Sequence, residues 1–140
     1  MRMLPWVYDD GGRQEAGFKG TADDCTVRAI VIATEIPYDQ VYRDLKNRMG
    51  TGHSPRNSVH KTIYKPYLED LGWQWTATMA IGTGCRVHLT QDELPSGRLI
   101  CRLSKHLVAV IDGTIRDTHD CSRSGRRCVY GYFTPKEEQP

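Results

Sequence analysis

The chain has 140 residues, about the length of one domain, and its 39% hydrophobic and 26% charged residues exclude wholesale disorder and fibrous architectures. Nineteen Lys and Arg residues against seventeen Asp and Glu residues leave a net charge of only +2, which does not favour a nucleic-acid partner. The longest apolar runs, such as LVAVI at 107–111, are too short for a membrane span or a secretion signal. We therefore expect a single domain over residues 1–140, without membrane contact and located in the cytoplasm.

The number of cysteines is odd, five in all, which does not suggest a disulfide framework in a chain without an export signal. At least one thiol is expected to be free. Each cysteine is a candidate for a nucleophile, a metal ligand or a small buried hydrophobic residue. The five are Cys25, Cys85, Cys101, Cys121 and Cys128.

The N-terminal part of the chain changes character near residue 22. Residues 1–20 contain turn-forming glycines and show no clear period, so we interpret them as an N-terminal extension, a loop with one short strand. The following segment, TADDCTVRAIVIATEI, has apolar residues at helical spacing, and Asp23 or Asp24 can cap the helix N-terminus. The sequence thus predicts that Cys25 opens a helix.

Two more helices are predicted before the chain changes to strands. One spans 37–49, where Pro37 suits the first turn, an apolar stripe follows, and Gly50 ends the helix. The other spans 59–71, and Pro66 is expected to bend or shorten it.

From residue 73 onward, short runs of alternating or apolar residues are typical of strands. A sheet after the helices predicts the α+β fold class, with the sheet antiparallel. The charged segment 135–140 is expected to be a frayed tail. The β-like runs lie at 73–81, 98–104, 105–111, 114–118 and 128–133.

The Asp-Gly pair at 112–113 is a strong signal for a two-residue hairpin turn. With this turn, opposed residues have numbers that sum to 225, so His106 faces His119 and Asp117 lies one diagonal step from His106. Opposed side chains share one face of a sheet, which puts the Asp117 carboxylate within reach of the imidazole. A carboxylate in that position fixes the tautomer of a histidine and stabilises its imidazolium form.

Cys25 has a favourable position for a nucleophilic thiol. The N-terminus of a helix carries partial positive charge and unpaired N–H groups, which stabilise a thiolate and can donate to the oxyanion of an acyl-transfer intermediate. The carboxylates of Asp23 and Asp24 oppose ionisation of the thiol unless one of them is held by other groups.

DDCTVRAIVIA, followed much later by SKHLVAVIDGTIRDTHD, resembles the papain-like cysteine peptidase superfamily. The resemblance covers about residues 20–120 and is greatest to the small, divergent members of bacteria and phages and to the bacteriocin-processing peptidases. It implies a papain-like fold with the nucleophile at the start of the central helix, and a catalytic triad of Cys25, His106 and Asp117. It implies no cofactor and no metal.

The sequence departs from this superfamily at two positions near the nucleophile. Many members have a Gln six residues before the Cys, where this chain has Lys19, and Gln14 lies further away. We expect the backbone to supply the oxyanion hole, helped by Thr21. The glycine that often follows the nucleophile in the bacteriocin-processing relatives is replaced by Thr26.

Three alternatives remain open at this stage. Asp120 is a second candidate for the third triad member if the hairpin register differs. The loop SRSGRR at 122–127 can be a solvated turn or a grip for an acidic substrate or phosphate. Zinc is a further alternative, because ligand-like residues occur in two groups: Cys85 with His88, and His119 with Cys121 and Cys128.

The sequence therefore predicts a cysteine-dependent hydrolase, a peptidase or isopeptidase, that acts on a peptide or protein substrate through a thioester acyl-enzyme. Two other functions use the same fold. An acyltransferase would resolve the thioester with an amine instead of water. A binding module would retain the papain-like fold without activity, and the missing Gln and the acidic pair before Cys25 favour that possibility.

Overall fold

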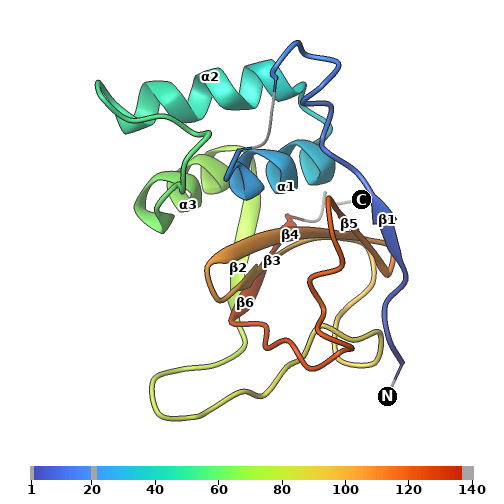
Figure 1. Cartoon of the computed structure of the whole chain (residues 1–140). Helices are drawn as coiled ribbons and strands as arrows, with labels where there is room; N and C mark the ends of the chain where they lie inside the picture. Colours follow the sequence, from blue (N-terminus) through green and yellow to red (C-terminus); the bar gives the residue numbers. More distant parts are fainter. Residues whose placement is uncertain (1, 20–21, 137–140) are drawn as a thin grey trace.

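The computed structural model describes residues 2–19 and 22–136. These residues form three helices and a six-stranded sheet, which confirms the α+β class (Figure 1). The helices follow one another in the chain and lie together on one side of the sheet. They are α1 (Cys25–Thr34), α2 (Tyr38–Met49) and α3 (Lys61–Asp70).

The sheet has the strand order β1-β5-β4-β3-β6-β2. Its strand pairs are antiparallel except at one edge, where β1 runs parallel to β5, so the expectation of an antiparallel sheet is wrong at that edge. A parallel neighbour is possible because β1 comes from the start of the chain and is not joined to β5 by a hairpin. The strands are β1 (Trp6–Tyr8), β2 (Trp73–Ala77), β3 (Arg98–Leu103), β4 (His106–Ile111), β5 (Thr114–Asp117) and β6 (Gly131–Pro135).

The sheet is covered on both faces, which explains why the run LVAVI is continuously apolar. Leu107 and Ala109 belong to the core between the helices and the sheet, whereas Val108 and Val110 belong to a second core on the other face. All four are at most 4% exposed. Strand β4 is therefore held from both sides, and His106 at its first residue is placed on a rigid element.

Helix α1 is the central helix and packs against β4. Val27, Ile30 and Ala33 recur at helical spacing and are completely buried. Burial of each of the two larger side chains contributes about 1.5–3 kcal/mol. The helix ends at Thr34, and the C-cap residue Glu35 adopts the left-handed conformation and donates its N–H to the Val31 carbonyl. The N-terminus of α1, with Cys25, is thereby fixed over the start of β4.

Helices α2 and α3 complete the layer above the sheet. The predicted stripe of α2 is buried at Tyr38, Val41 and Leu45. Helix α3 begins two residues later than predicted because His60 is its N-cap, with the Nδ1 atom accepting from Thr62 N–H. Pro66 lies inside α3 without ending it.

The closing strand differs from the sequence-based expectation. It was placed at 128–133, but β6 begins at Gly131 because Cys128 instead forms a β-bridge with His88. Gly131 is required at the start of β6, since a Cβ atom there would lie 2.3 Å from the ring of Trp75. Strand β2 likewise ends at Ala77, earlier than predicted.

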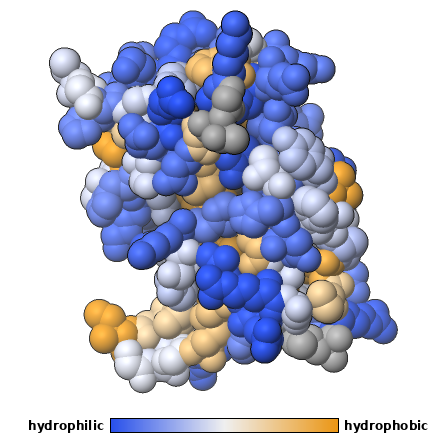
Figure 2. Space-filling model, in the orientation of Figure 1, coloured by the Kyte–Doolittle hydropathy of each residue, from blue (hydrophilic) through white to orange (hydrophobic). Residues whose placement is uncertain are grey.

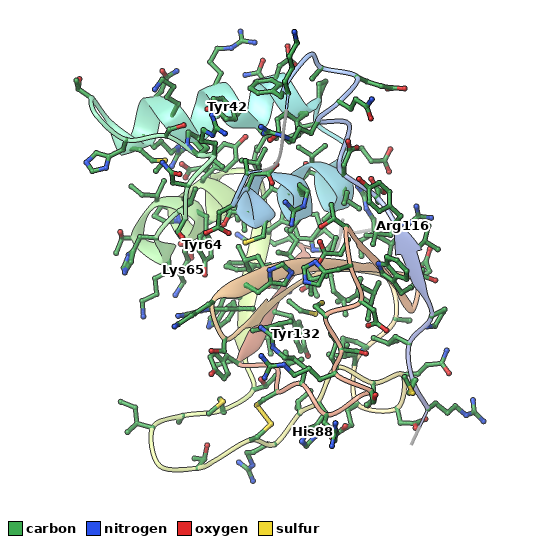
Figure 3. The ribbon with its side chains drawn as sticks, viewed as in Figure 1. Tyr42, Tyr64, Lys65, His88, Arg116 and Tyr132 are labelled. Atoms are coloured by element: carbon green, nitrogen blue, oxygen red, sulfur yellow. A yellow bond between two sulfur atoms is a disulfide. The ribbon has the colours of Figure 1, made fainter. Side chains whose placement is uncertain are left out.

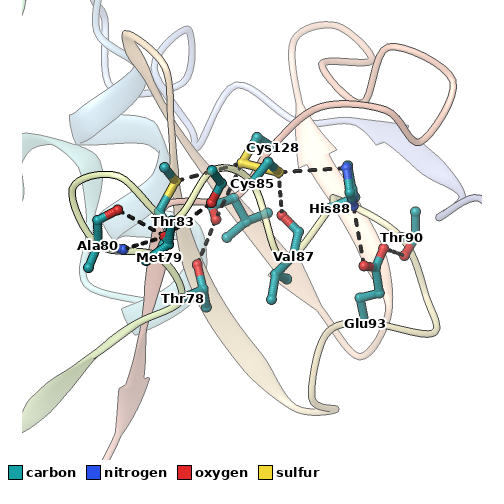
Figure 4. Close-up of a disulfide and its surroundings, with 12 residues drawn as sticks. Thr78, Met79, Ala80, Thr83, Cys85, Val87, His88, Thr90, Glu93 and Cys128 are labelled. Carbon is teal, nitrogen blue, oxygen red and sulfur yellow. Dashed lines mark hydrogen bonds and ion pairs between the residues drawn. A yellow bond between two sulfur atoms is a disulfide. The ribbon is translucent and has the colours of Figure 1, made fainter.

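Two of the five cysteines are joined in a disulfide. Cys85 and Cys128 form a disulfide that joins the long loop after β2 to the segment before β6 (Figure 4). The sequence argued against a disulfide framework, and this single bridge is the exception, because an odd number of cysteines still permits a bridge when the fold brings two together. Cys25, Cys101 and Cys121 are free, which confirms that at least one thiol is available.

The segment described at the N-terminus joins the edge of the sheet, although the three residues of its strand are exposed. The strand expected within residues 1–20 is β1, and Arg13 is only 7% exposed. At the other end, Pro135 still belongs to β6, and residues 137–140 of the expected tail lie outside the described part of the chain. None of the three helices described is long and apolar enough to cross a bilayer.

Candidate active site

Cys25 is the first residue of α1, as predicted, and its side chain is half-buried. The N-cap residue is Asp24, whose backbone carbonyl accepts from Arg28 N–H. Its side chain makes no cap hydrogen bond, so the expected capping by an Asp side chain does not occur. The Asp24 carboxylate therefore does not occupy the first N–H groups of α1, which remain available beside the thiol.

His106 and Asp117 form a direct contact. The hairpin has the predicted register, with Ile111 opposite Thr114 and Ala109 opposite Arg116. His106 Nε2 lies 2.6 Å from Asp117 Oδ2, and both side chains are nearly buried. The structure thus brings together the imidazole and the carboxylate that the turn chemistry predicted as neighbours.

The imidazole of His106 also contacts the thiol of Cys25. Burial lowers the pKa of His106, but hydrogen bonds to Asp117, Cys121 and Cys25 outweigh it and raise that pKa to about 11. Burial raises the pKa of Cys25, but the hydrogen bond and the charge of His106, with a backbone hydrogen bond from Leu107, lower it overall. The two groups therefore favour a thiolate–imidazolium pair.

Asp117 is held as a carboxylate by several donors. Besides His106, the Thr118 N–H donates to Oδ1 at 2.7 Å and the Arg28 guanidinium lies 3.3 Å from the same oxygen. Burial raises the pKa of Asp117, but the hydrogen bond and charge of His106 and these further contacts lower it overall. The ionised form can orient the imidazole across the neutral pH range.

Arg28 is a site residue that the sequence analysis missed. It lies one turn after Asp24 on α1, is only 8% exposed, and its guanidinium contacts the carboxylates of both Asp24 and Asp117. Its positive charge also helps to lower the pKa of Cys25. The signal that identifies it is a charged residue within the otherwise apolar run VRAIVIA, spaced i,i+4 from an aspartate.

The same contacts answer the electrostatic objection raised by the acidic pair before the nucleophile. Asp24 is 1% exposed, pairs with Arg28, and accepts a 2.6 Å hydrogen bond from the Tyr38 hydroxyl. Arg13 donates to that hydroxyl at 2.7 Å and lies 3.6 Å from the Asp24 carboxylate. Two guanidinium groups therefore compensate the charge of Asp24 next to Cys25.

The N-terminal strand supports the third member of the site. The backbone carbonyl of Asp117 accepts from Asp9 N–H at 3.0 Å and from the indole of Trp6 at 3.1 Å. Residues that the sequence analysis treated as an extension thus fix the end of β5 where the carboxylate must be positioned.

Cys121 adds a second thiol beside the imidazole. It is 2% exposed, lies close to His106 and helps to raise the pKa of that imidazole. Ligand atoms of His106, Asp117 and Cys121 lie within 4.8 Å of one another, so these three side chains have donors suited to a transition metal. The zinc groups suggested by the sequence are not assembled, since Cys85 and Cys128 are joined in the disulfide.

Two clefts meet at Cys25 and His106. The first, of about 780 Å³, is bordered by residues 10–19 together with Arg28 and His119. The second, of about 520 Å³, lies toward α3 and the hairpin between β3 and β4, with Tyr64, Arg102 and Lys105 in its wall. The face of the molecule in this view is mainly hydrophilic (Figure 2). An extended chain laid over Cys25 would have a cleft on each side.

Lys19 and Gln14 both border the first cleft, and Lys19 is exposed. The side chains that could replace the missing glutamine thus face the same cavity as the nucleophile. Thr21, the other residue expected to help, lies outside the described residues.

The remaining candidates have other partners. Asp120 Oδ1 accepts from Ser122 N–H, and the observed register favours Asp117 as the partner of His106. The ring of His119 contacts that of His106 at a tilt of 48°, with ring centroids 5.3 Å apart. In the loop 122–127, Arg127 donates to the carbonyls of Ser104 and Cys121, and none of the loop residues borders either cleft.

Comparisons of this chain with family models, with curated proteins and with solved structures found no match. The chemical capability of the site is therefore inferred from its own geometry.

Proposed function

We propose that the protein is a cysteine-dependent hydrolase of papain-like type that cleaves a peptide or isopeptide bond. The observation that carries this proposal is the chain of contacts from the half-buried thiol of Cys25 through the imidazole of His106 to the carboxylate of Asp117. A nucleophile, a base and a group that orients the base are the three parts that acyl transfer requires.

In the proposed reaction, the Cys25 thiolate attacks the carbonyl carbon of the scissile bond, and the C=O oxygen becomes an oxyanion. The N–H groups at the start of α1 stabilise this oxyanion. The imidazolium of His106 donates its proton to the leaving amine, which departs as the C–N bond breaks and leaves a thioester on Cys25. The neutral imidazole then takes a proton from water, whose oxygen attacks the thioester and releases the acid.

Asp117 holds His106 through Nε2, which leaves Nδ1 as the nitrogen available to Cys25. Arg28 keeps two buried carboxylates paired and adds positive charge beside the thiolate. These roles need no cofactor.

The test is digestion of a proteome-derived peptide mixture, followed by mass spectrometry of the new termini. Wild-type protein should create cleavage sites that are absent with Cys25→Ala and with His106→Ala. Addition of a primary amine in a parallel reaction shows whether an amine replaces water, as in an acyltransferase. Identical peptide patterns for wild type and Cys25→Ala over the whole mixture would refute a peptidase and support a binding module.

A further inference from the structure

The two clefts at Cys25 differ in how their charged residues are paired. In the cleft beside residues 10–19, the buried guanidinium of Arg28 is paired with carboxylates of the protein itself, and Lys19 is an exposed cation at the border. The cleft toward α3 contains three cations, Lys61, Arg102 and Lys105. Within residues 2–19 and 22–136, no carboxylate lies at salt-bridge distance from any of these three.

Arg102 is the most informative of the three cations. It lies on β3, is partly buried, and its guanidinium makes no hydrogen bond to any residue in the described part of the chain. Arginine at the wall of a cavity usually pairs with a carboxylate, because its planar group carries five donors. An unpaired guanidinium beside a nucleophile thus has the geometry to bind a ligand carboxylate.

Tyr64 provides a second, independent observation. Its side chain is 95% buried, since only 5% of the residue is exposed, and its ring packs edge-on against Phe133. Its hydroxyl borders the cleft and has no hydrogen-bond partner among the described residues. Burial raises the pKa of Tyr64, the charge of Arg102 lowers it and the charge of Cys25 raises it, so the hydroxyl is near both of these groups. The hydroxyl oxygen itself is not enclosed, so it can exchange a hydrogen bond with a ligand in the cleft.

The same wall continues away from the nucleophile. A neighbouring cavity of about 390 Å³ shares Lys61, Tyr64 and Arg102 with this cleft and adds Lys65, whose ammonium lies over the ring of Trp75. Tyr64 and Lys65 extend from α3 on the side of the molecule opposite Arg116 (Figure 3).

Asp23 and His60 also line this cleft, and their charge counts in the electrostatic balance. Asp23 borders the cleft close to Cys25, but its carboxylate accepts a 3.0 Å hydrogen bond from the Ser58 hydroxyl. The Nδ1 atom of His60 accepts the Thr62 backbone N–H, since His60 is the N-cap of α3. Three cations and one carboxylate still leave the wall positive.

We propose that this cleft is a substrate subsite for a carboxylate, bound by the guanidinium of Arg102 and the hydroxyl of Tyr64, with Lys61 and Lys105 adding positive potential. This subsite rests on the hydrolase function proposed above. It makes the substrate an acidic peptide, with an Asp or Glu side chain or a terminal carboxylate on the α3 side of the scissile bond. Electrostatic complementarity of this kind selects among substrates.

The test uses thiol-alkylating reagents that need no catalysis. Bromoacetyl-glutamate α-amide and bromoacetyl-glutamine α-amide differ only in one side-chain carboxylate, and bromoacetyl-glutamine with a free α-carboxylate represents a chain terminus. In each case the Cys25 sulfur forms a C–S bond and bromide leaves. Rates at Cys25 are read by peptide mass spectrometry at low ionic strength.

Wild-type protein should react about tenfold faster with at least one carboxylate reagent than with the neutral one, as expected for a charge-assisted hydrogen bond in a partly exposed site. The reagent that gains shows whether a side-chain or a terminal carboxylate is preferred. Arg102→Gln should bring this ratio towards unity, with the rate of the neutral reagent in the same variant as the reference. Tyr64→Phe should reduce the ratio, and 0.5 M salt should weaken it.

Arg43→Gln is the matched control, because Arg43 is an exposed arginine on α2 that pairs with Asp39 and borders neither cleft. It should keep the wild-type ratio. Equal rates for all three reagents with wild type, or a ratio unchanged by Arg102→Gln, would overturn the subsite. Failure of the hydrolase function has a different signature, since the reagent ratio would persist without any cleavage that depends on Cys25.

Discussion

Replacement of His106 by Ala tests whether Cys25 is held as part of an ion pair. In the wild type, burial alone would raise the pKa of Cys25, and His106 is the main group that reverses this effect. The variant removes the imidazolium and its hydrogen bond but leaves the thiol buried at the start of α1. The pKa of Cys25 should therefore rise.

The size of the effect follows from the contact. An opposite charge at hydrogen-bond distance lowers a thiol pKa by about 1 to 3, and the fraction of thiolate at a fixed pH below the pKa falls tenfold for each unit lost. A more basic thiolate is also more nucleophilic, which recovers about threefold per unit. The net expectation is an alkylation rate at Cys25 that is about 3- to 40-fold lower at pH 6.5.

The assay is the rate of iodoacetamide alkylation at each cysteine between pH 5 and 9, read by peptide mass spectrometry. Cys101, which is completely buried, serves as an internal reference for unfolding. His88→Ala is the matched control, because His88 lies beside the disulfide, far from α1 (Figure 3). An unchanged pH profile at Cys25 in His106→Ala, with the fold intact, would refute the ion pair.

Three further outcomes are expected. Asp117→Asn removes the carboxylate whose hydrogen bond does most to raise the pKa of His106, so that pKa should fall from about 11 by about 1 to 3, as followed by NMR of the imidazole. Because the folded pKa exceeds the ordinary 6.5, protonated His106 stabilises the fold below pH 6.5 and loses this effect as pH rises towards 11, and urea unfolding should show the loss at lower pH in the variant. Arg28→Met should destabilise the fold by about 3–5 kcal/mol in the same unfolding assay, because it leaves buried carboxylates without their partner, and a loss below 1 kcal/mol would contradict this role. Replacing Cys85 and Cys128 by Ala should cost up to about 4 kcal/mol from the freed loop of 43 residues, with no change in Cys25 alkylation.

Local patterns in the sequence determine much of the candidate site. The apolar period after Asp24 places Cys25 at the first residue of α1, and the Asp-Gly turn fixes the register between β4 and β5. Asp112 and Gly113 both adopt positive φ angles, as a tight hairpin of this kind requires. Because the turn sets the register, the spacing in the sequence is enough to predict that His106 and Asp117 are neighbours.

Long-range contacts decide what surrounds these side chains. Nothing in the local pattern places β1 beside β5, joins Cys85 to Cys128, or brings Cys121 to the imidazole. Such contacts form between segments distant in the chain, so their pairing depends on how whole elements pack and not on the preferences of neighbouring residues.

Long-range contacts also decide the electrostatic environment of Cys25. From the sequence, the carboxylate of Asp24 beside Cys25 counts against a thiolate. In the folded protein that carboxylate is paired with Arg28 and Tyr38. The cation without a carboxylate partner is Arg102, which borders the cleft toward α3. The sequence determines the residue types and their local geometry. Which partner compensates each buried charge depends on how the helices pack against the sheet, because the energy of a buried charge depends on its neighbours in space.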